Sequence, residues 1–275
     1  MPELPEVEVS RQGLIPHLCG QRLLGAVVRT PRLRHEIPVV LTSRLAGLRL
    51  DAIGRRGKYL LLDCESRAGG GWLVLHLGMS GSLRLVPPDT PAQRHDHVDL
   101  IFAQTVLRLR DPRRFGALLW HEGSPVESHP MLAGLGIEPL AAAFDGDWLY
   151  AATRRRHGPI KPLLMDSRLV VGIGNIYAAE SLFRAGISPL RRADRISRVR
   201  YRVLAQAIRA TLEAAIAAGG SSVRDYVHSD GGTGCFQLSC AVYDRGGEPC
   251  PSCGKPVRVT RQAGRSTYYC PRCQR

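Results

Sequence analysis

The chain has 275 residues, a length that favours more than one domain, each with its own buried core. A formal net charge of +14 indicates a polyanionic partner, and nucleic acid is the leading candidate. No apolar run approaches the roughly 18 residues of a membrane span and the acidic start is unlike a signal peptide, so we expect a cytoplasmic protein with no membrane partner. Only three of the 38 basic residues are lysines, namely Lys58, Lys161 and Lys255, so each is a candidate for a specific role.

The first eight residues combine a candidate nucleophile with candidate acid and base groups. Met1 precedes a small residue, so we expect its removal, which would leave Pro2 with a free secondary amine. An α-amino group has a reference pKa near 7.7–8.0 against about 10.4 for lysine, so at neutral pH it is unprotonated roughly a hundredfold more often. Attack of such an amine on a sugar carbon gives a charged iminium, and Glu3 and Glu6 stand close by as acid and base groups. The alternative is a frayed terminus or a helix cap.

A helix is expected over residues 5–18, where Val7, Leu14 and Leu18 form an apolar stripe and Pro16 should kink or shorten the end. Short strand-like runs follow, separated by Gly, Pro and charged turns. This pattern is typical of a β-sandwich or barrel. The runs cover residues 23–28, 48–53, 59–63, 72–77, 81–86, 98–102, 106–110 and 117–120.

The composition changes to Ala, Gly and Asp near residues 139–147, where we place a domain boundary. Helices are expected beyond it over residues 175–185 and 197–218, with Ser197 as the N-cap of the second. The polar, glycine-rich segment 221–238 is long enough to be a functional loop, and disorder without a role is the alternative. One apolar face of the longer helix is expected to carry Val199, Val203, Ala207 and Ala210.

Two Cys-x-x-Cys pairs, separated by sixteen residues, match the four-cysteine pattern of a zinc site. The residues between them are expected to form a hairpin from strands 257–260 and 266–269, with its tip at 262–265. Four thiolates leave no open coordination position, so we expect one structural Zn²⁺, no other cofactor, and a functional hairpin tip. The expected zinc ligands are Cys250, Cys253, Cys270 and Cys273. The scattered Cys19, Cys64, Cys235 and Cys240 are expected to be free thiols with no assigned role.

Two turns carry candidate DNA-contacting side chains. In residues 111–116, Arg113 stands beside Phe115, and arginine can contact phosphates or base edges while an apolar side chain wedges between stacked bases. A glycine turn also holds His76 and Met79. A solvated turn is the alternative for the first, and a core histidine with a packing methionine is the alternative for the second.

Residues 172–177 superficially resemble a dinucleotide fingerprint, but Tyr177 stands in place of the third glycine and no parallel α/β alternation surrounds it. We expect instead a glycine turn at a helix N-terminus, with backbone amides and Asn175 facing a phosphate. Lys161 and the arginine run 154–156 lie upstream and join the phosphate-binding candidates, although a charge run is usually a solvated face.

Together these motifs resemble, over essentially the whole chain, the bacterial formamidopyrimidine-DNA glycosylases, which are 8-oxoguanine DNA glycosylases and AP lyases. The related endonuclease VIII branch begins Pro-Glu-Gly-Pro-Glu, whereas this chain has Leu4, which favours the formamidopyrimidine branch. The motifs that carry the resemblance are residues 2–8, 57–60, 76–81, 95–99, 111–116, 172–180 and 229–231 and the terminal cysteine ribbon.

The resemblance implies an α+β, multidomain fold. Its expected parts are an N-terminal catalytic β-sandwich domain with flanking helices (1–138), a helix-two-turn-helix DNA-binding domain with a lesion-covering loop (139–238) and a zinc ribbon (239–275). The implied partner is damaged double-stranded DNA, bound by a monomer. The implied reaction flips out and removes oxidised purines, then cleaves the abasic strand by β,δ-elimination.

The family's residue roles map onto matching positions of this chain. Pro2 matches the nucleophile and Schiff-base former, Glu3 the acid/base group, and Lys58 the lysine of β-elimination. Arg265 matches the arginine of phosphate binding and δ-elimination. The expected DNA-contacting residues are His76, His95, Arg113, Arg156, Lys161 and Asn175. The residues that match the gap-filling trio are Met79, Arg113 and Phe115, and the supporting acidic residues are Glu6 and Glu180.

The chain departs from the family pattern at three places. Cys235 stands where an aromatic residue or threonine is common, Asp244 where glycine is common, and arginines 154–156 where lysines are common. These departures bear on lesion preference and on the order of the loop.

Three alternative functions remain at this point. One is an endonuclease VIII-like glycosylase for oxidised pyrimidines, and another is a non-catalytic zinc-ribbon DNA-binding protein. The third is a metal-dependent nuclease that uses Glu3, Glu6 and the histidines of residues 95–97, although no third ligand cluster accompanies those histidines.

Overall fold

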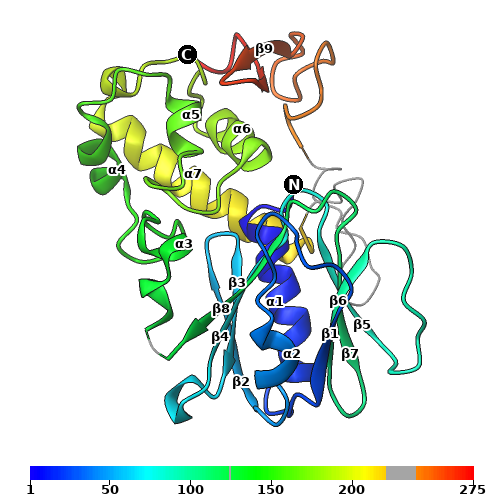
Figure 1. The fold of residues 1–275 in the computed structure, drawn as a ribbon. Coiled ribbons are helices and arrows are strands. Elements are labelled where there is room, and N and C mark those ends of the chain that lie inside the picture. Colours follow the sequence, from blue (N-terminus) through cyan, green and yellow to red (C-terminus); the bar gives the residue numbers. More distant parts are fainter. Residues whose placement is uncertain (124, 221–239) are drawn as a thin grey trace. The chain divides into compact units, whose positions relative to one another are not determined.

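Figure 1 shows the computed structural model, which describes residues 1–123, 125–220 and 240–275. The chain divides into two compact units. The first unit contains Met1–Ala133 and residues 218–220, and the second contains Gly134–Ala217 and residues 240–275. The division between 133 and 134 lies close to the expected boundary, and the ribbon groups with the helices. The finer three-domain division stays a prediction.

The first unit is the expected β-sandwich, made of two four-stranded antiparallel sheets. The strand orders are β1-β6-β7-β5 and β2-β3-β4-β8. Each of the eight runs expected from the sequence coincides with one of these strands. Their bounds are β1 (Gly25–Val28), β2 (Leu50–Arg56), β3 (Tyr59–Cys64), β4 (Gly71–His76), β5 (Ser82–Val86), β6 (Asp96–Ile101), β7 (Val106–Arg110) and β8 (Ala117–Glu122).

The core of this unit lies between the two sheets. Alternate leucines of β3 and β4, such as Leu60 and Leu73, pack in one cluster with Leu100 and Leu109 of the other sheet. All four are at most 3% exposed, and burying one such side chain contributes about 1.5–3 kcal/mol. The short helices α2 (Val40–Arg44) and α3 (Pro130–Ala133) and the 3₁₀ turns η1 (Ser66–Ala68) and η2 (Val126–Ser128) complete the unit.

Helix α1 (Leu4–Leu18) packs chiefly against β2 and β3. Its apolar stripe of Val7, Leu14 and Leu18 joins the core as expected. The expected shortening at Pro16 is wrong, because the helix continues through this residue to its predicted end, and the expected kink stays a prediction. A proline in the last turn removes a single N–H, and the buried leucines on either side of it hold that turn in place.

The second unit is a group of helices followed by a two-stranded hairpin. Helices α4 and α6 pack against α7, and α5 packs against α6. The two helices expected from the sequence are α6 and α7, whereas α4 and α5 were missed. The bounds are α4 (Gly146–Thr153), α5 (Ile160–Leu164), α6 (Asn175–Arg184), η3 (Ala193–Arg195), α7 (Arg198–Ala217), β9 (Arg258–Gln262) and β10 (Arg265–Tyr269).

The apolar face that the sequence predicts for α7 is not the face that the structure buries. Val199 is 68% exposed and Val203 is 45% exposed, whereas Tyr201, Leu204 and Ile208 are fully buried. The larger side chains bury more apolar area than valine and alanine, so they decide which face turns inward. Ser197 caps the helix as expected, because its hydroxyl accepts a hydrogen bond from the backbone N–H of residue 200.

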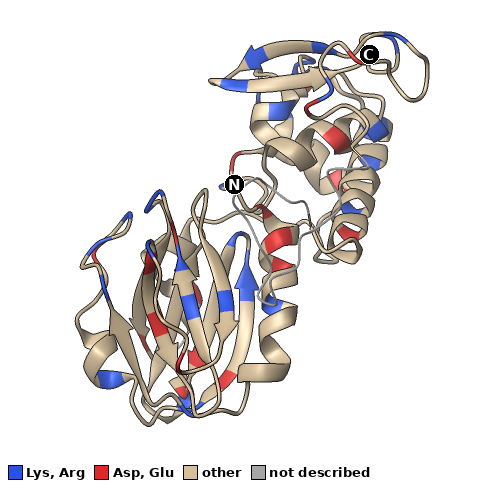
Figure 2. Ribbon diagram, turned by 90° about the vertical axis from the view of Figure 1, so that its right-hand side faces the viewer, with Lys and Arg blue, Asp and Glu red and all other residues tan. Residues whose placement is uncertain are grey.

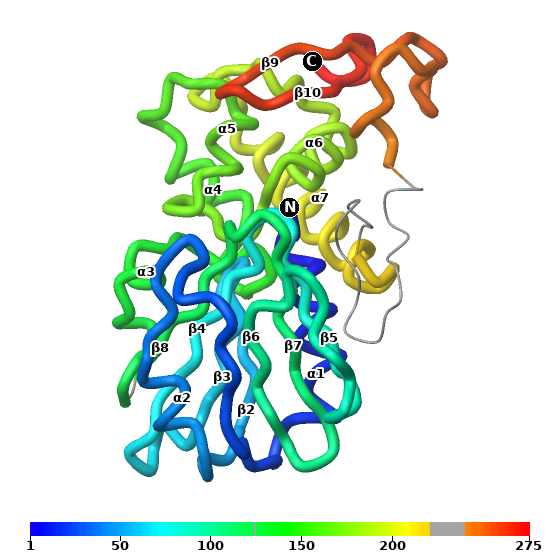
Figure 3. The backbone as a smooth tube through the Cα atoms, turned by 45° about the vertical axis from the view of Figure 1, so that its right-hand side comes forward, coloured from blue at the N-terminus to red at the C-terminus, as the bar shows by residue number. Residues whose placement is uncertain are grey.

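The hairpin lies beside α6, where Figure 3 traces the end of the chain. Ala263 and Gly264, with φ of 46° and 75°, form its two-residue tip, as type I′ turns require. The expected strands are confirmed within two residues, and Arg265 begins β10 directly after the tip. Within the described residues, no helix has the length and apolar character needed to cross a membrane.

Candidate functional site

The N-terminal residues are held by a capping box at the start of α1. The Glu3 side chain accepts from the backbone N–H of Glu6, and Glu6 Oε2 accepts from the backbone N–H of Glu3 at 2.8 Å. Both carboxyl side chains are buried. The backbone of Gly220 lies close to the Glu6 carboxyl group, because a Cβ at Gly220 would lie 3.2 Å from Glu6 Oε1. Pro2 therefore immediately precedes a well-fixed helix start that carries two carboxyl groups. The frayed-terminus alternative is wrong, whereas the helix-cap alternative is confirmed for Glu3 and Glu6.

Lys58 occupies the second position of a two-residue hairpin turn. Strands β2 and β3 pair Arg56 with Tyr59, which leaves Gly57 and Lys58 as the turn. Gly57 has a φ of 57°, the left-handed geometry that favours glycine in tight hairpins. Arg55 Nη1 donates to the Gly57 carbonyl at 3.0 Å. The place of Lys58 is therefore set by strand register and by the closed turn.

His76 lies in the same sheet with a neutral imidazole. Its Nδ1 accepts from the backbone N–H of Gly78 at 3.0 Å, which puts the ring proton on Nε2. Burial lowers the pKa of His76 to about 4, and the charges of Lys58 and Arg34 act in the same direction. At neutral pH this residue therefore offers a hydrogen-bond donor and no positive charge.

The Asp111 carboxylate joins two turns of the sandwich. Ser80 Oγ donates to Asp111 Oδ1 at 2.7 Å, and the backbone N–H of Gly116 donates to Oδ2 at 2.7 Å. The backbone N–H of Arg113 donates in turn to Ser80 Oγ at 3.1 Å. Asp111 is fully buried, so its charge is stabilised by these donors. We did not identify this joint from the sequence, where its only signal is the aspartate that opens the 111–116 motif.

The three expected gap-filling residues lie on these two adjoining turns. Met79 is 38% exposed and Phe115 is 45% exposed, so both apolar side chains are open to solvent. The Arg113 guanidinium carbon lies 5.0 Å from the centroid of the Phe115 ring. A Cβ at Gly78 would lie 2.3 Å from the Phe115 carbonyl carbon, so the two backbones pack directly against each other. Two apolar side chains and an arginine therefore project from one rigid joint.

The histidines at 95 and 97 have different surroundings. His95 is partly exposed with a φ of 76°, and its pKa is lowered first by burial and then by Arg94 and Arg110. His97 sits at a register irregularity of β6, and its Nε2 lies 2.9 Å from the Asp111 carbonyl oxygen, as a donor. Bulges often re-aim side chains near functional sites. Among the described residues, only the four ribbon cysteines form a group able to hold a metal, so this stretch provides no site for the metal-nuclease alternative.

In the second unit, Lys161 ties the start of α6 to the hairpin. Its Nζ donates to Asn175 Oδ1 at 2.6 Å, to Thr267 Oγ1 at 2.8 Å and to the Ser266 carbonyl at 3.2 Å. Lys161 is 1% exposed, which argues for a positioning role in place of the direct phosphate contact expected from the sequence. Because Asn175 Oδ1 accepts from the lysine, the Asn175 amide nitrogen is the group left to donate.

Asn175 and Arg265 are brought to the same edge of the second unit by this buried lysine. Asn175 Nδ2 donates to the Ser266 carbonyl at 3.0 Å, directly beside Arg265, which is exposed. A cavity of about 240 Å³ lies under the hairpin tip, and Lys161, Gln262 and Arg265 are among the residues that line it. Asn175 is also the first residue of α6, where orphan backbone N–H groups favour an anion.

The arginine run contains one structural arginine, Arg154, and two exposed ones, Arg155 and Arg156. The guanidinium carbon of Arg154 lies 3.8 Å from the Tyr150 ring centroid, and its nitrogens donate to the carbonyls of residues 193, 194 and 196. Arg156, the expected DNA contact, is exposed. Lysine and arginine residues occur along both units, as the blue segments of the ribbon in Figure 2 show.

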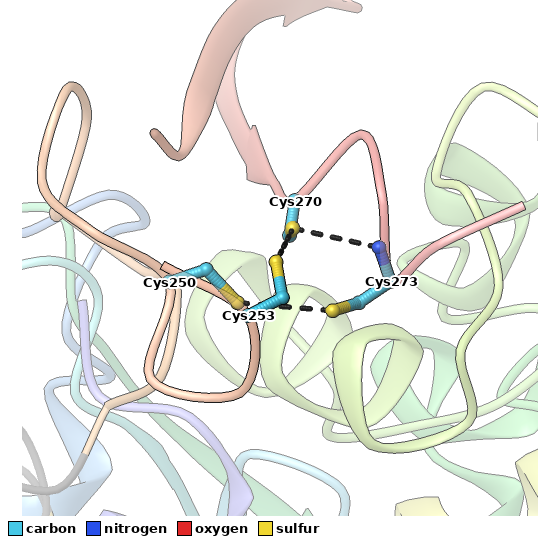
Figure 4. A group of neighbouring side chains, drawn as sticks. All are labelled: Cys250, Cys253, Cys270 and Cys273. Carbon is cyan, nitrogen blue, oxygen red and sulfur yellow. Dashed lines mark hydrogen bonds between the residues drawn. The ribbon is translucent and has the colours of Figure 1, made fainter. Parts of the chain in front are cut away.

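The four ribbon cysteines converge on one point, drawn in Figure 4. Their sulfur atoms all lie within 4.8 Å of one another, with Cys250 and Cys273 at 3.9 Å and Cys253 and Cys270 at 3.5 Å. A tetrahedral zinc with Zn–S bonds of about 2.3 Å needs sulfur separations of roughly 3.8 Å. The donor set therefore fits one structural zinc. The other described cysteines, at 19, 64 and 240, are free thiols as expected.

Glu180, the second supporting acidic residue, fixes the chain that leads into the ribbon. Its carboxylate accepts from the backbone N–H groups of Ala241, Val242 and Tyr243 at 2.8 to 3.0 Å. The expected functional loop 221–238, the motif at 229–231 and Cys235 lie outside the described residues.

A β-sandwich with a proline-glutamate start, followed by a helical unit that carries a zinc ribbon, defines a class of DNA-processing enzymes. The chain matches the models of the formamidopyrimidine-DNA glycosylase N-terminal domain over residues 1–118 and of the H2TH domain of the same enzymes over residues 135–227. Residues 247–275 match a zinc finger found in FPG and IleRS. The chain belongs to the formamidopyrimidine-DNA glycosylase family.

Individual relatives agree over their full length. A formamidopyrimidine-DNA glycosylase of Dechloromonas aromatica is 64% identical over 276 residues, with all of both chains covered. The solved MutM (Fpg) protein of Thermus thermophilus is 42% identical with a TM-score of 0.87, covering 99% of this chain and 98% of its own. A Lactococcus lactis FPG mutant in complex with Fapy-dG containing DNA is 34% identical with a TM-score of 0.91, covering 99% of each chain.

Membership of this family makes the chain an enzyme of DNA repair with glycosylase and AP lyase activity. The alternative of a non-catalytic zinc-ribbon DNA-binding protein is therefore wrong. It also agrees with the resemblance to the formamidopyrimidine branch expected from Leu4.

Proposed function

We propose that this enzyme excises oxidised purines, such as 8-oxoguanine and formamidopyrimidines, through a Schiff base at Pro2. The observation that supports this most strongly is the capping box, because it fixes the helix start and the two buried carboxyl groups that follow Pro2 in the sequence. The proposal requires removal of Met1, because only then is the Pro2 nitrogen an amine. A solved relative holds Fapy-dG containing DNA, which supports the same substrate class here.

The first chemical step is attack of the Pro2 nitrogen on C1′ of the damaged nucleotide. The N-glycosidic bond breaks, and the base leaves with the bonding electrons and takes up a proton. The Pro2 nitrogen then loses its N–H proton, and the lone pair left behind forms the iminium as the bond between C1′ and the ring oxygen breaks. Glu3 donates a proton to the departing ring oxygen. The neighbouring Glu6 keeps Glu3 in place through the two hydrogen bonds of the capping box.

Strand cleavage follows from the acidity that the iminium confers on the sugar. Loss of a C2′ proton expels the 3′ phosphate, which is β-elimination, and a later proton loss expels the 5′ phosphate, which is δ-elimination. We assign Lys58 to the first elimination, because the closed β2–β3 turn holds it in a defined place. Arg265, held next to Asn175 at the hairpin, is assigned to phosphate binding and to the second elimination.

The enzyme must extrude the nucleotide before Pro2 can reach it, at a cost of a few kcal/mol. Met79 and Phe115 are assigned to the gap in the stack, because both are apolar, exposed and carried by the turns that Asp111 joins. Arg113 is assigned to the unpaired base or phosphate beside them. His76, His95, Arg156 and Asn175 are assigned to phosphate contacts.

The ribbon supports this chemistry without taking part in it. Zinc held by four thiolates has no open position for substrate, so it supplies folding energy to the hairpin that presents Arg265. We further propose that the enzyme acts as a monomer on damaged double-stranded DNA, in the cytoplasm at the nucleoid.

The proposal is tested with a duplex that contains 8-oxoguanine and a matched undamaged duplex. The purified protein, with loss of Met1 verified by mass, is incubated with each duplex in chelator too dilute to strip the zinc. We expect cleavage of the damaged strand alone, with phosphate at both ends of the gap. Tight binding of the damaged duplex without base release or scission would contradict the assignment.

A further inference from the structure

A largely buried ion pair links helix α1 to the turn that carries Lys58. Arg55 Nε donates to Glu8 Oε2 at 2.9 Å, and both side chains are 11% exposed. Glu8 follows Glu3 by just over one helical turn of α1. Neither Glu8 nor Arg55 has a part in the chemistry proposed above.

A second nitrogen of the Arg55 guanidinium donates a hydrogen bond to the backbone of the turn itself. Its Nη1 donates to the Gly57 carbonyl at 3.0 Å, one residue before Lys58. A single planar group therefore spans a carboxylate on α1 and the backbone of the β2–β3 turn. Because the guanidinium fork is rigid, it fixes the separation of its two acceptors as well as joining them.

Glu8 is itself held in one orientation. Arg11 Nη2 donates to its Oε1 at 2.7 Å, and Gln12 Nε2 donates to the same oxygen at 3.0 Å. Burial raises the pKa of Glu8, but hydrogen bonds from Arg11 and Arg55 outweigh it and hold the pKa below its ordinary range. The carboxylate is therefore charged at neutral pH and has a fixed direction.

A buried pair of this kind is a weak source of stability, because desolvation offsets most of the attraction. The ion pair is more informative about how α1 and the β2–β3 turn are joined than about stability. Glu8 belongs to helix α1, whose N-cap is Glu3, and the Gly57 carbonyl that Arg55 binds belongs to the turn whose next residue is Lys58.

We propose that Glu8 and Arg55 are positioning residues that fix Lys58 with respect to the start of α1. This role rests on the proposed function of Lys58 in β-elimination. Small displacements of a reacting group can cost on the order of a hundredfold in rate, so loosening this link should slow the step that uses Lys58.

The test is a double-mutant cycle on a duplex with a preformed abasic site, under single-turnover conditions. We expect Glu8→Gln to slow β-elimination about tenfold with little change in the duplex Kd. In a Lys58→Ala background the same substitution should have no further effect, because the group being positioned is gone. Arg55→Lys keeps a positive charge beside Glu8, so the variant should fold. Because lysine cannot bind both acceptors, we expect it to slow β-elimination as Glu8→Gln does, and to have no further effect in the Lys58→Ala background.

Asp99→Asn is the matched control, because Asp99 forms a buried ion pair with Arg108 in the other sheet. We expect it to leave the β-elimination rate within about twofold, and to combine additively with Lys58→Ala, as distant sites do. Wild-type rates in folded Glu8→Gln and Arg55→Lys would overturn the positioning role. The role would also be overturned if Glu8→Gln or Arg55→Lys slowed β-elimination in the Lys58→Ala background by the same factor as in the wild type. A wild-type protein that leaves the abasic duplex uncleaved would instead overturn the proposed function, and this role with it.

Discussion

At the scale of single residues, buried charged groups in this chain orient backbone that carries other functional side chains. The Asp111 carboxylate holds the turns of Met79 and Phe115, and Glu180 holds the loop that leads into the ribbon. Lys161 does the same for Asn175 and the hairpin. Each satisfies its charge with several hydrogen bonds, which offset the cost of burial and leave the groups they orient available for other contacts.

His76 should make the stability of the first unit depend on pH. The unfolded residue has a pKa near 6.5 and the folded residue one of about 4, so the unfolded chain binds the extra proton as the pH falls. The contribution is fully present above pH 6.5 and is lost between 6.5 and 4, by up to about 3 kcal/mol. Urea unfolding across this range should show a smaller loss for His76→Gln. The exposed His17→Gln serves as control and should behave as wild type, and an equal loss in all three proteins would contradict the assignment.

Asp244 adopts a backbone conformation that favours glycine, the residue that the resemblance leads us to expect at this position. Its φ is 59°, and its Oδ1 accepts from the Tyr268 hydroxyl at 3.1 Å. Asp244→Ala keeps the strain and loses the bond, so it should destabilise the zinc-loaded protein by about 1–2 kcal/mol. Asp244→Gly loses the bond but relieves the strain, and should change stability by less than about 1 kcal/mol. Thermal unfolding measures both, and equal losses would contradict this account.

At the scale of elements, two tight hairpins and one helix start carry the proposed chemistry. The β2–β3 turn presents Lys58, the β9–β10 turn presents Arg265, and the capping box of α1 fixes the approach to Pro2. Short turns with glycine in a left-handed conformation leave few alternative backbone states. A functional side chain beside such a turn is therefore placed with little entropic cost on binding.

Removal of one zinc ligand should disable the β9–β10 hairpin and leave the sandwich intact. We expect Cys270→Ser to lose zinc and to weaken binding of an abasic duplex, because the hairpin depends on the metal for its folding. Cys19→Ser, in the first unit, should keep one zinc per chain and wild-type affinity. Metal analysis and a binding titration measure the two effects, and a Cys270→Ser protein with full zinc content and affinity would refute the ligand assignment.

At the scale of the whole molecule, the chain combines two units that each fold around a core of their own. The sandwich unit carries the proposed nucleophile, the lysine and the gap-filling side chains, and the helical unit carries the proposed phosphate contacts and the ribbon. The net charge of +14 agrees with a polyanionic substrate, so we expect affinity for the duplex to fall steeply with salt.

Local patterns made much of this predictable from the sequence. The strands of the sandwich follow from short apolar runs between glycine and proline turns, and the zinc site follows from cysteine spacing alone. The burial of Lys161 and the joint at Asp111 were not predictable, because their partners are remote in sequence: Thr267 for the lysine and Ser80 for the aspartate. The buried face of α7 was predicted wrongly because the sequence does not show which of two apolar faces packs inward. Val199 is apolar but exposed, and Tyr201 is buried instead.

The claim at the centre of this account is that the amine of Pro2 forms the covalent intermediate. Borohydride reduction during reaction with an 8-oxoguanine duplex, followed by protease digestion and mass analysis, locates the trapped sugar on the chain. We expect the adduct on the peptide that begins at Pro2, and a loss of trapping in Pro2→Gly of at least about tenfold, roughly 1.4 kcal/mol of the barrier. An adduct on Lys58, or undiminished trapping in Pro2→Gly at a residue other than the terminus, would contradict the claim.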